Sequence, residues 1–82
     1  MIDEQTIRSA IVKLFLGGDS SFPISLETDL LEQGICDSLG LTQLAAELER
    51  LDPGLRFQDQ DITRENLATI EAILSFSQRV DR

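Results

Sequence analysis

The chain has 82 residues, a formal net charge of −8 at pH 7, one cysteine and no histidine. This length allows one domain over residues 1–82, and a lone cysteine excludes an internal disulfide. Without histidine the chain has no Ser-His-Asp triad and no imidazole metal ligand, so we predict no metal site. The acidic balance argues against nucleic acid and anionic membranes, and it favours partners with basic patches.

No segment of the sequence predicts export or insertion into a membrane. Asp3 and Glu4 stand where a secretory signal would be basic. The apolar runs are far shorter than the about 20 residues that span a bilayer. We therefore expect a cytoplasmic monomer, a compartment with which a free thiol is compatible.

The spacing of apolar residues predicts a first helix from about Asp3 to Leu16, ended by Gly17 and Gly18. Its apolar stripe consists of Ile7, Ala10, Ile11, Leu14 and Phe15.

A long connection over residues 17–36 follows, and in a compact domain apolar side chains must tie such a segment down. Residues 27–32 are predicted to form one helical turn, capped by Thr28 or Asp29 and ended by Gly34. The candidates for tying the connection down are Phe22, Ile24, Leu26, Leu30, Leu31 and Ile35.

The second helix is predicted from Asp37 or Ser38 to Leu51, before the helix-breaking sequence Asp52-Pro53-Gly54. Its predicted apolar stripe consists of Leu41, Leu44, Ala45, Leu48 and Leu51.

Residues 55–57 are predicted to be extended or turn-like, followed by a short third helix that Asp61 or Thr63 caps and that runs through Leu67. Thr69 is the predicted cap of the last helix. No segment alternates long enough to predict a strand, so we expect an all-α bundle of three to four helices with a long loop between the first two. The last helix is expected to bury Ile70, Ile73 and Leu74, with Phe76 and Val80 as further candidates.

The junction before the second helix has the most informative chemistry. Ser38 stands where the long loop becomes a helix, and its hydroxyl should be exposed because the apolar stripe begins only with Leu39 and Leu41. The free N–H groups and the positive end of a helix favour an anion there, such as a phosphate ester. Asp37 could help to hold a divalent cation during phosphoryl transfer, and Gly40 leaves room beside the first turn.

Simpler interpretations exist for each of these features. Asp37 or Ser38 could be only the helix cap, in which case the chain would be an acidic helical interaction domain without a cofactor. Cys36 is expected to be a small packed loop residue. Residues 59–70 look briefly like a calcium loop, but Arg64 and Ile70 replace the glycine and the glutamate that such a loop requires, which excludes it.

Several features occur together around Ser38. They are a loop leucine beside an acid in Asp29-Leu30-Leu31-Glu32, then Gly34-Ile35-Cys36-Asp37-Ser38-Leu39, then a helix of apolar spacing. Residues 61–73 are also similar to the segment that leads into the last helix of stand-alone carriers. From Thr28 to Ile73 the sequence therefore resembles the acyl carrier protein family, including its peptidyl and D-alanyl relatives.

The resemblance implies that a phosphopantetheinyl transferase attaches phosphopantetheine from coenzyme A to Ser38, with Asp37 supporting that step. The chain would then be a carrier without catalytic residues, holding an acyl or aminoacyl group as a thioester and presenting it to ligase and synthase enzymes. Leu39, Gln43 and Glu47 would contact those partners. Leu44 and Phe57 are candidates for lining a cleft for the acyl chain.

The cargo is suggested by one departure from the family pattern. Carriers of fatty acid synthesis typically have Val-Glu-Leu where this chain has Thr42-Gln43-Leu44, so a recognition acid is replaced by a neutral amide. The sequence looks closer to D-alanyl and other aminoacyl carriers, which favours a specialised carrier over a housekeeping one.

The charge is concentrated in the part of the chain that contains Ser38. Residues 1–52 hold ten acidic and three basic residues, which is −7 of the total of −8. Glu47, Glu49 and Asp52 are expected to form an acidic face, which serves either docking or solubility.

Overall fold

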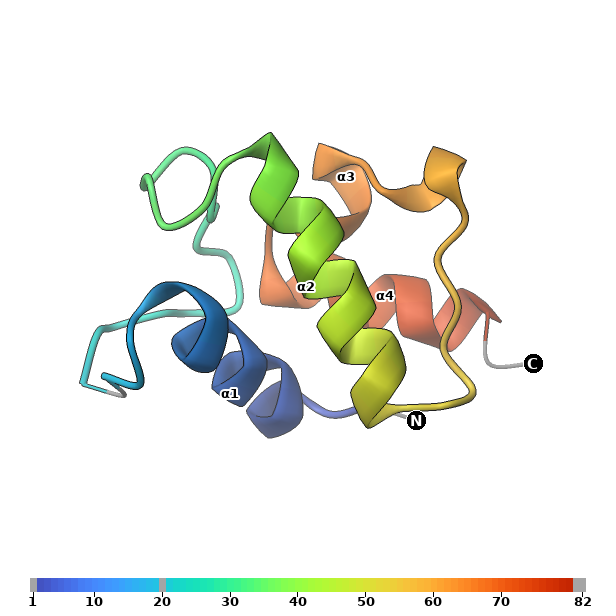
Figure 1. The fold of residues 1–82 in the computed structure, drawn as a ribbon, viewed down its shortest axis with the longest axis horizontal. Coiled ribbons are helices and arrows are strands. Elements are labelled where there is room, and N and C mark those ends of the chain that lie inside the picture. The colour runs from blue at the N-terminus through green and yellow to red at the C-terminus, as the bar shows by residue number, and fades with distance from the viewer. Residues whose placement is uncertain (1, 20, 81–82) are drawn as a thin grey trace.

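The computed structural model describes residues 2–19 and 21–80. Within them the chain forms four α-helices and no strand, which confirms the all-α prediction (Figure 1). A 3₁₀ turn, η1, covers Asp59–Asp61. The helices are α1 (Glu4–Phe15), α2 (Ser38–Leu51), α3 (Arg64–Leu67) and α4 (Ile70–Val80).

The helix ends are set by local side-chain bonds and by glycine. Asp3 caps α1 by accepting the N–H of Thr6 at 2.8 Å, and Gly17 and Gly18 follow the helix with φ of +60° and +85°. Glycine is favoured at such positive φ because it has no Cβ. The predicted end at these two glycines is therefore confirmed.

Of the two residues predicted to cap the short third helix, Thr63 is the cap and Asp61 is not. The Thr63 hydroxyl accepts the N–H of Asn66 at 3.3 Å and caps α3, whereas Asp61 accepts the N–H of Gln58 at 3.0 Å and closes η1. Thr69 caps α4 as predicted, because its hydroxyl accepts the N–H of Ala72 at 3.0 Å.

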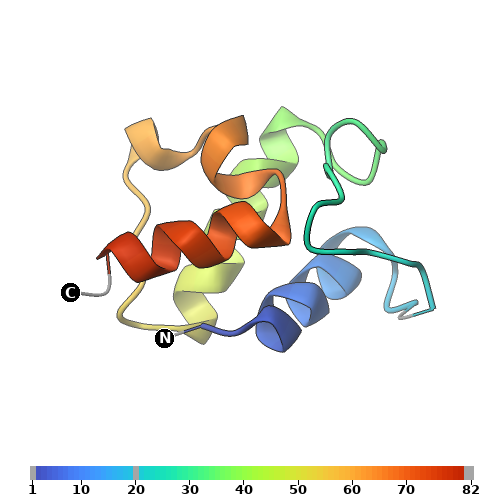
Figure 2. The same ribbon diagram turned by 180° about the vertical axis from the view of Figure 1, so that it is seen from behind.

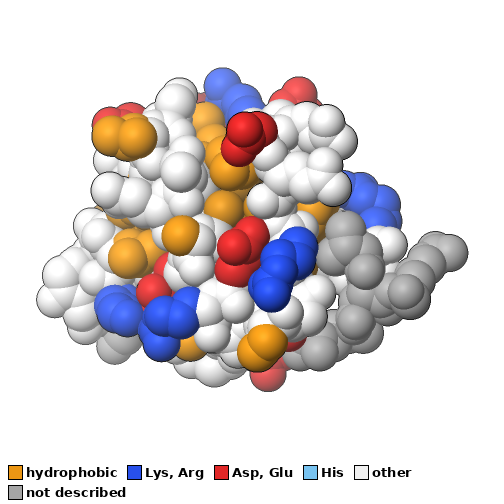
Figure 3. Space-filling view, turned by 45° about the vertical axis from the view of Figure 1, so that its right-hand side comes forward, with side chains coloured by type: hydrophobic (Ala, Val, Ile, Leu, Met, Phe, Trp, Pro, Cys, Tyr) orange, Lys and Arg blue, Asp and Glu red, His pale blue; other side chains and the backbone are white. Residues whose placement is uncertain are grey.

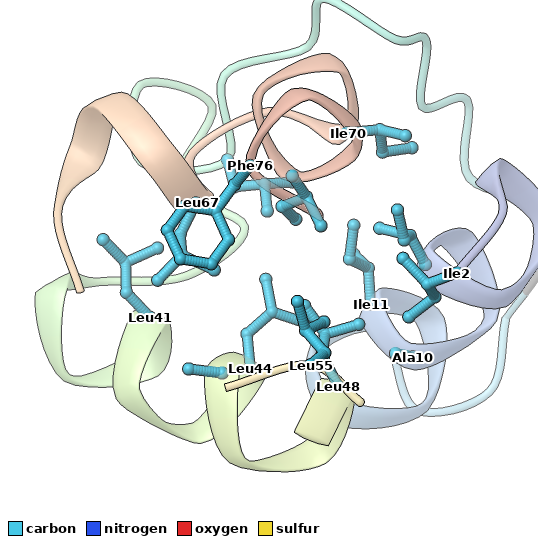
Figure 4. Packing of buried hydrophobic residues seen from close by; sticks show 14 of the residues in the cluster. Ile2, Ala10, Ile11, Leu41, Leu44, Leu48, Leu55, Leu67, Ile70 and Phe76 are labelled. Atoms are coloured by element: carbon cyan, nitrogen blue, oxygen red, sulfur yellow. The ribbon is translucent and has the colours of Figure 1, made fainter. Parts of the chain in front are cut away.

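The bundle is arranged so that α2 contacts α1 on one side and α3 on the other, while α4 packs on α1 and α3 (Figures 1 and 2). Apolar side chains from all four helices meet at the centre, together with Leu55 from the linker between α2 and η1 (Figure 4). The buried cluster consists of Ile2, Ile7, Ala10, Ile11, Ile24, Leu30, Leu41, Leu44, Ala45, Leu48, Leu55, Leu67, Ile70, Ile73 and Phe76.

The linker between α2 and η1 has a turn at residues 53–54 and no regular structure over residues 55–58, and it is held at two points. The backbone N–H of Phe57 donates to the Glu49 carboxylate at 2.7 Å. The Phe57 ring stacks on that of Phe76, with centroids 4.6 Å apart.

The residues that α4 was predicted to bury differ in their exposure. Leu74 is half-buried rather than buried, Phe76 is buried, and the side chain of Val80 lies outside the described part of the chain.

The long α1–α2 loop is anchored by apolar side chains, as predicted, and by its backbone. Ile24 and Leu30 are buried in the core, and Leu26, Leu31 and Ile35 pack against it. The fully buried Leu30 donates its N–H to the carbonyl of Ala68 at 2.8 Å, and the N–H of Glu71 reaches the carbonyl of Leu26 at 3.0 Å. These bonds tie the loop to α3 and α4. The prediction that Phe22 is an anchor is wrong, since 43% of that residue is exposed.

The predicted turn over residues 27–32 is present but shifted, and it is too short to be a helix. The Asp29 carboxylate accepts the N–H groups of Leu31 and Glu32, each at 3.0 Å, so Asp29 rather than Thr28 is its cap. Gly34 ends the turn with φ of +72°.

Two apolar residues of α2 differ from the prediction. Leu51 is 39% exposed, because at about 100° per residue it falls at the margin of the buried stripe, on the last turn of the helix. Leu39 is 69% exposed, so the buried stripe begins with Leu41 and not with Leu39.

Candidate functional site

Ser38 is the first residue of α2, and its side chain is exposed to solvent. Asp37 precedes it with an extended backbone, and the Asp37 carboxylate accepts the N–H of Gly40 at 2.8 Å. The sequence left the cap open between these two residues, and the structure assigns it to Asp37. The hydroxyl of Ser38 is therefore available for chemistry that a capping hydroxyl could not perform.

An open hollow of about 830 Å³ lies beside Ser38. It is bounded by the end of α1, the last residues of the long loop, the first turns of α2 and the first residue of α3. This volume is within the range of sites for small molecules, which is about 300–1,000 Å³. The lining residues are Phe15, Leu31, Gly34, Ile35, Cys36, Asp37, Ser38, Leu39, Gly40, Gln43 and Arg64.

The floor of the hollow is close-packed at Gly40. A Cβ added to Gly40 would lie 2.8 Å from the Cβ of Cys36 and 3.1 Å from Cε1 of Phe15. We predicted that Gly40 leaves room for an outside group, whereas the chain's own Cys36 and Phe15 fill that space. Gly40 thus lets α1 and the loop approach the first turn of α2 closely.

Cys36 is half-buried at this contact, as the sequence suggested. Burial raises the pKa of its thiol, and the nearby carboxylates of Asp37 and Asp29 raise that pKa further. A raised pKa keeps the group as the weakly reactive thiol, so Cys36 is a packing residue.

Arg64 brings the positive charge to the hollow. Its Nη2 lies 3.1 Å from Oδ2 of Asp29 and 4.0 Å from Oε2 of Glu32, and 57% of its side chain is exposed. The N–H of Glu32 is the main cause that lowers the pKa of the Asp29 carboxyl, and Arg64 adds to it. The sequence analysis noted Arg64 only as a mismatch to a calcium loop, because its contact with Asp29 spans 35 positions.

Of the three predicted docking residues, two line the hollow and one lies outside it. Leu39 and Gln43 are exposed and line the hollow together with Ser38. Glu47 lies outside it, and its carboxylate contacts Nζ of Lys13 at 3.0 Å and Nη2 of Arg50 at 2.6 Å, with only 11% of the side chain exposed. These two cations lower the pKa of Glu47 to about 2, chiefly through the bond from Arg50.

The expected acidic face on α2 is therefore largely committed to internal bonds. Glu47 links α2 to α1, Glu49 holds the backbone of Phe57, and Asp52 accepts the N–H of Gly54 at 3.1 Å. Acidic and basic side chains are intermixed on the face drawn in Figure 3. These three acids thus contact groups of the chain itself.

Neither candidate for an acyl-chain cleft lines the hollow beside Ser38. Leu44 is fully buried in the core, and Phe57 stacks on Phe76. A chain entering between them would have to displace core contacts.

Comparison with protein-family models gives no match, and neither does comparison with curated proteins. Among residues 2–19 and 21–80, no three acidic or cysteine side chains are grouped so that they could hold a metal ion. In the same part of the chain, no helix combines the length and the apolar character that crossing a membrane requires.

Proposed function

We propose that this protein is a carrier whose Ser38 receives phosphopantetheine. The observation that carries the proposal is the position of Ser38, which is exposed, free of the capping role and located at the edge of an 830 Å³ hollow. The Asp37-Ser38-Leu39 sequence at the start of a 14-residue helix supports it, because it resembles the attachment motif of acyl carrier proteins.

The residues around Ser38 fit such a group. The hollow combines apolar side chains with Gln43 and Arg64, so it offers both apolar surface and groups that hydrogen-bond to amides and phosphates. The arm would supply a thiol that carries acyl groups as thioesters. Leu39 and Gln43 lie beside the attachment point and are exposed, which suits contact with partner enzymes.

The attachment step belongs to a transferase. The Ser38 Oγ attacks the phosphorus of coenzyme A that bears the pantetheine, a P–O bond to Ser38 forms, and the bond to the bridging oxygen breaks. Adenosine 3′,5′-bisphosphate leaves, and the hydroxyl proton passes to a base on the transferase. In that step Asp37, which precedes Ser38, would help to hold a Mg²⁺ ion brought by the transferase and its coenzyme A.

Intact-mass measurement tests the proposal. The purified chain is incubated with coenzyme A, Mg²⁺ and a broad-specificity phosphopantetheinyl transferase, and we expect a gain of one phosphopantetheine. Ser38→Ala should abolish the gain, and Ser9→Ala, which removes another exposed serine, should retain it. No gain under conditions that load a control carrier would leave the alternative, an acidic interaction domain without a cofactor.

For the cargo, we propose a specialised carrier in the cytoplasm that works with a dedicated ligase and synthase. Gln43 in place of the usual glutamate favours this over housekeeping fatty acid synthesis, and D-alanine or another amino acid is the alternative to a fatty acid. Loading of the modified chain with ATP and a ligase encoded beside it, compared between fatty acids and amino acids, distinguishes these cargoes.

A further inference from the structure

Arg64 is the one cation among the described residues that line the hollow beside Ser38. The other charged lining residue is Asp37, whose carboxylate already accepts the N–H of Gly40. An anion attached to Ser38 would therefore share this hollow with a single opposite charge among the described lining residues.

The present partners of Arg64 do not hold it tightly. A single nitrogen, Nη2, makes both contacts, at 3.1 Å to Asp29 and 4.0 Å to Glu32, although a guanidinium has five N–H donors. Both contacts are exposed, and exposed ion pairs contribute little because water screens them. The arginine is thus able to change partner.

Asp29 does not depend on Arg64 for its own position. Its Oδ1 accepts the N–H groups of Leu31 and Glu32, while Arg64 contacts the other oxygen, Oδ2. Losing the arginine would leave this turn capped. The Asp29–Arg64 pair therefore joins the long loop to α3 without being required for either element.

We infer that Arg64 is a positioning residue for the phosphate of a group attached to Ser38, and that it leaves Asp29 to pair with that phosphate. This inference rests on the proposed function and adds a residue to it. A planar guanidinium matches a phosphate with two parallel N–H···O bonds, which makes it a better partner for phosphate than a lysine would be. Modification would then also release the link between the loop and α3, so the modified and unmodified chains would differ at a surface beside Ser38.

The test uses phosphoserine at position 38, introduced during chemical synthesis of the 82-residue chain, so that it needs no transferase. The second pKa of a phosphate monoester is about 6 and is followed by ³¹P NMR during a pH titration. A paired cation lowers the pKa of an acidic group by about 1 unit or more. We expect Arg64→Gln to raise the phosphate pKa by about 1 unit relative to the parent chain.

Arg50→Gln is the matched control, because Arg50 is an equally exposed arginine that pairs with Glu47 on another part of the molecule. It removes the same charge and should change the phosphate pKa much less. A second variant, Asp29→Asn, keeps a capping oxygen and frees the arginine, so it should lower the phosphate pKa. That lowering should largely disappear when Arg64→Gln is also present. Circular dichroism checks that each variant is folded.

Equal effects of Arg64→Gln and Arg50→Gln on the phosphate pKa would overturn the inference. If the transferase loads Ser38 in that case, the proposed function stands and only the role of Arg64 falls. Conversely, a pKa shift specific to Arg64→Gln in a chain that no transferase loads would support phosphate recognition at Ser38 and count against the carrier function.

Discussion

The first turn of α2 and the turns that follow it differ in what their side chains contact. Ser38 and Leu39 face solvent, and Leu39 is 69% exposed. Leu44 and Leu48, further along the same helix, are fully buried among residues of the other helices. One helix thus supplies both an exposed serine and part of the core, so changes in its two parts should affect different properties.

The largest expected effect comes from the buried part. Leu48→Ala should lower the free energy of unfolding by about 2–5 kcal/mol, because it leaves a cavity at a position with no exposure. Urea denaturation followed by circular dichroism measures this. Leu39→Ala removes the same side chain from the exposed turn and should cost much less, and equal costs would contradict the division of α2.

Gly40→Ala tests the boundary between the two parts. The added Cβ would meet Cys36 at 2.8 Å and Phe15 at 3.1 Å, so α1 or the loop must move. We expect a loss of about 1–3 kcal/mol, as for other overpacked sites. Pairing it with Cys36→Gly, which removes the clashing Cβ, and with Phe15→Leu identifies the clashing partner. Rescue by Phe15→Leu alone would place the strain at the ring.

The contact of Glu47 with Lys13 and Arg50 predicts that the stability of the fold falls at acidic pH. The folded chain lowers the pKa of Glu47 from 4.5 to about 2, so the carboxylate stabilises the fold above about pH 4.5. That contribution should be lost as the pH falls from about 4.5 to about 2.

Glu47→Gln should cost about 1 kcal/mol or less at pH 7 and should reduce the further loss of stability between pH 5 and pH 3. Urea midpoints at several pH values measure both effects. Glu27→Gln, which changes an exposed loop acid, is the control. An unchanged pH profile in Glu47→Gln would mean that these ion pairs do not persist in solution.

Local patterns predicted what depends on neighbours in sequence. Apolar spacing located α1, α2 and α4, and side-chain chemistry located the caps at Thr69 and Asp37, the latter as one of two alternatives. The exposure of Phe22 and Leu51 was not predicted. The spacing of apolar residues indicates which of them share a face, but it does not indicate where the core ends.

Contacts between distant residues were not predictable in this way. Glu47 was expected on an acidic docking face and instead bonds Lys13, 34 positions away. Arg64, which lines the candidate site, bonds Asp29, 35 positions away. A charged residue has no periodic signal that identifies its partner. The position of Ser38 was therefore predictable, and the presence of Arg64 in the same hollow was not.

The smallest expected effect on stability belongs to the residue with the largest expected effect on function. Because Asp37 makes the capping bond, Ser38→Ala removes no bond of the cap, and alanine is the better helix former. We expect a change in unfolding free energy within about 0.5 kcal/mol together with complete loss of phosphopantetheine loading. Asp37→Ala, by contrast, should cost about 0.5–2 kcal/mol through the lost cap. If Ser38→Ala were the more destabilising of the two, Ser38 would be a structural residue. The first turn of α2 would then serve stability as the buried turns do, which contradicts the role proposed for Ser38.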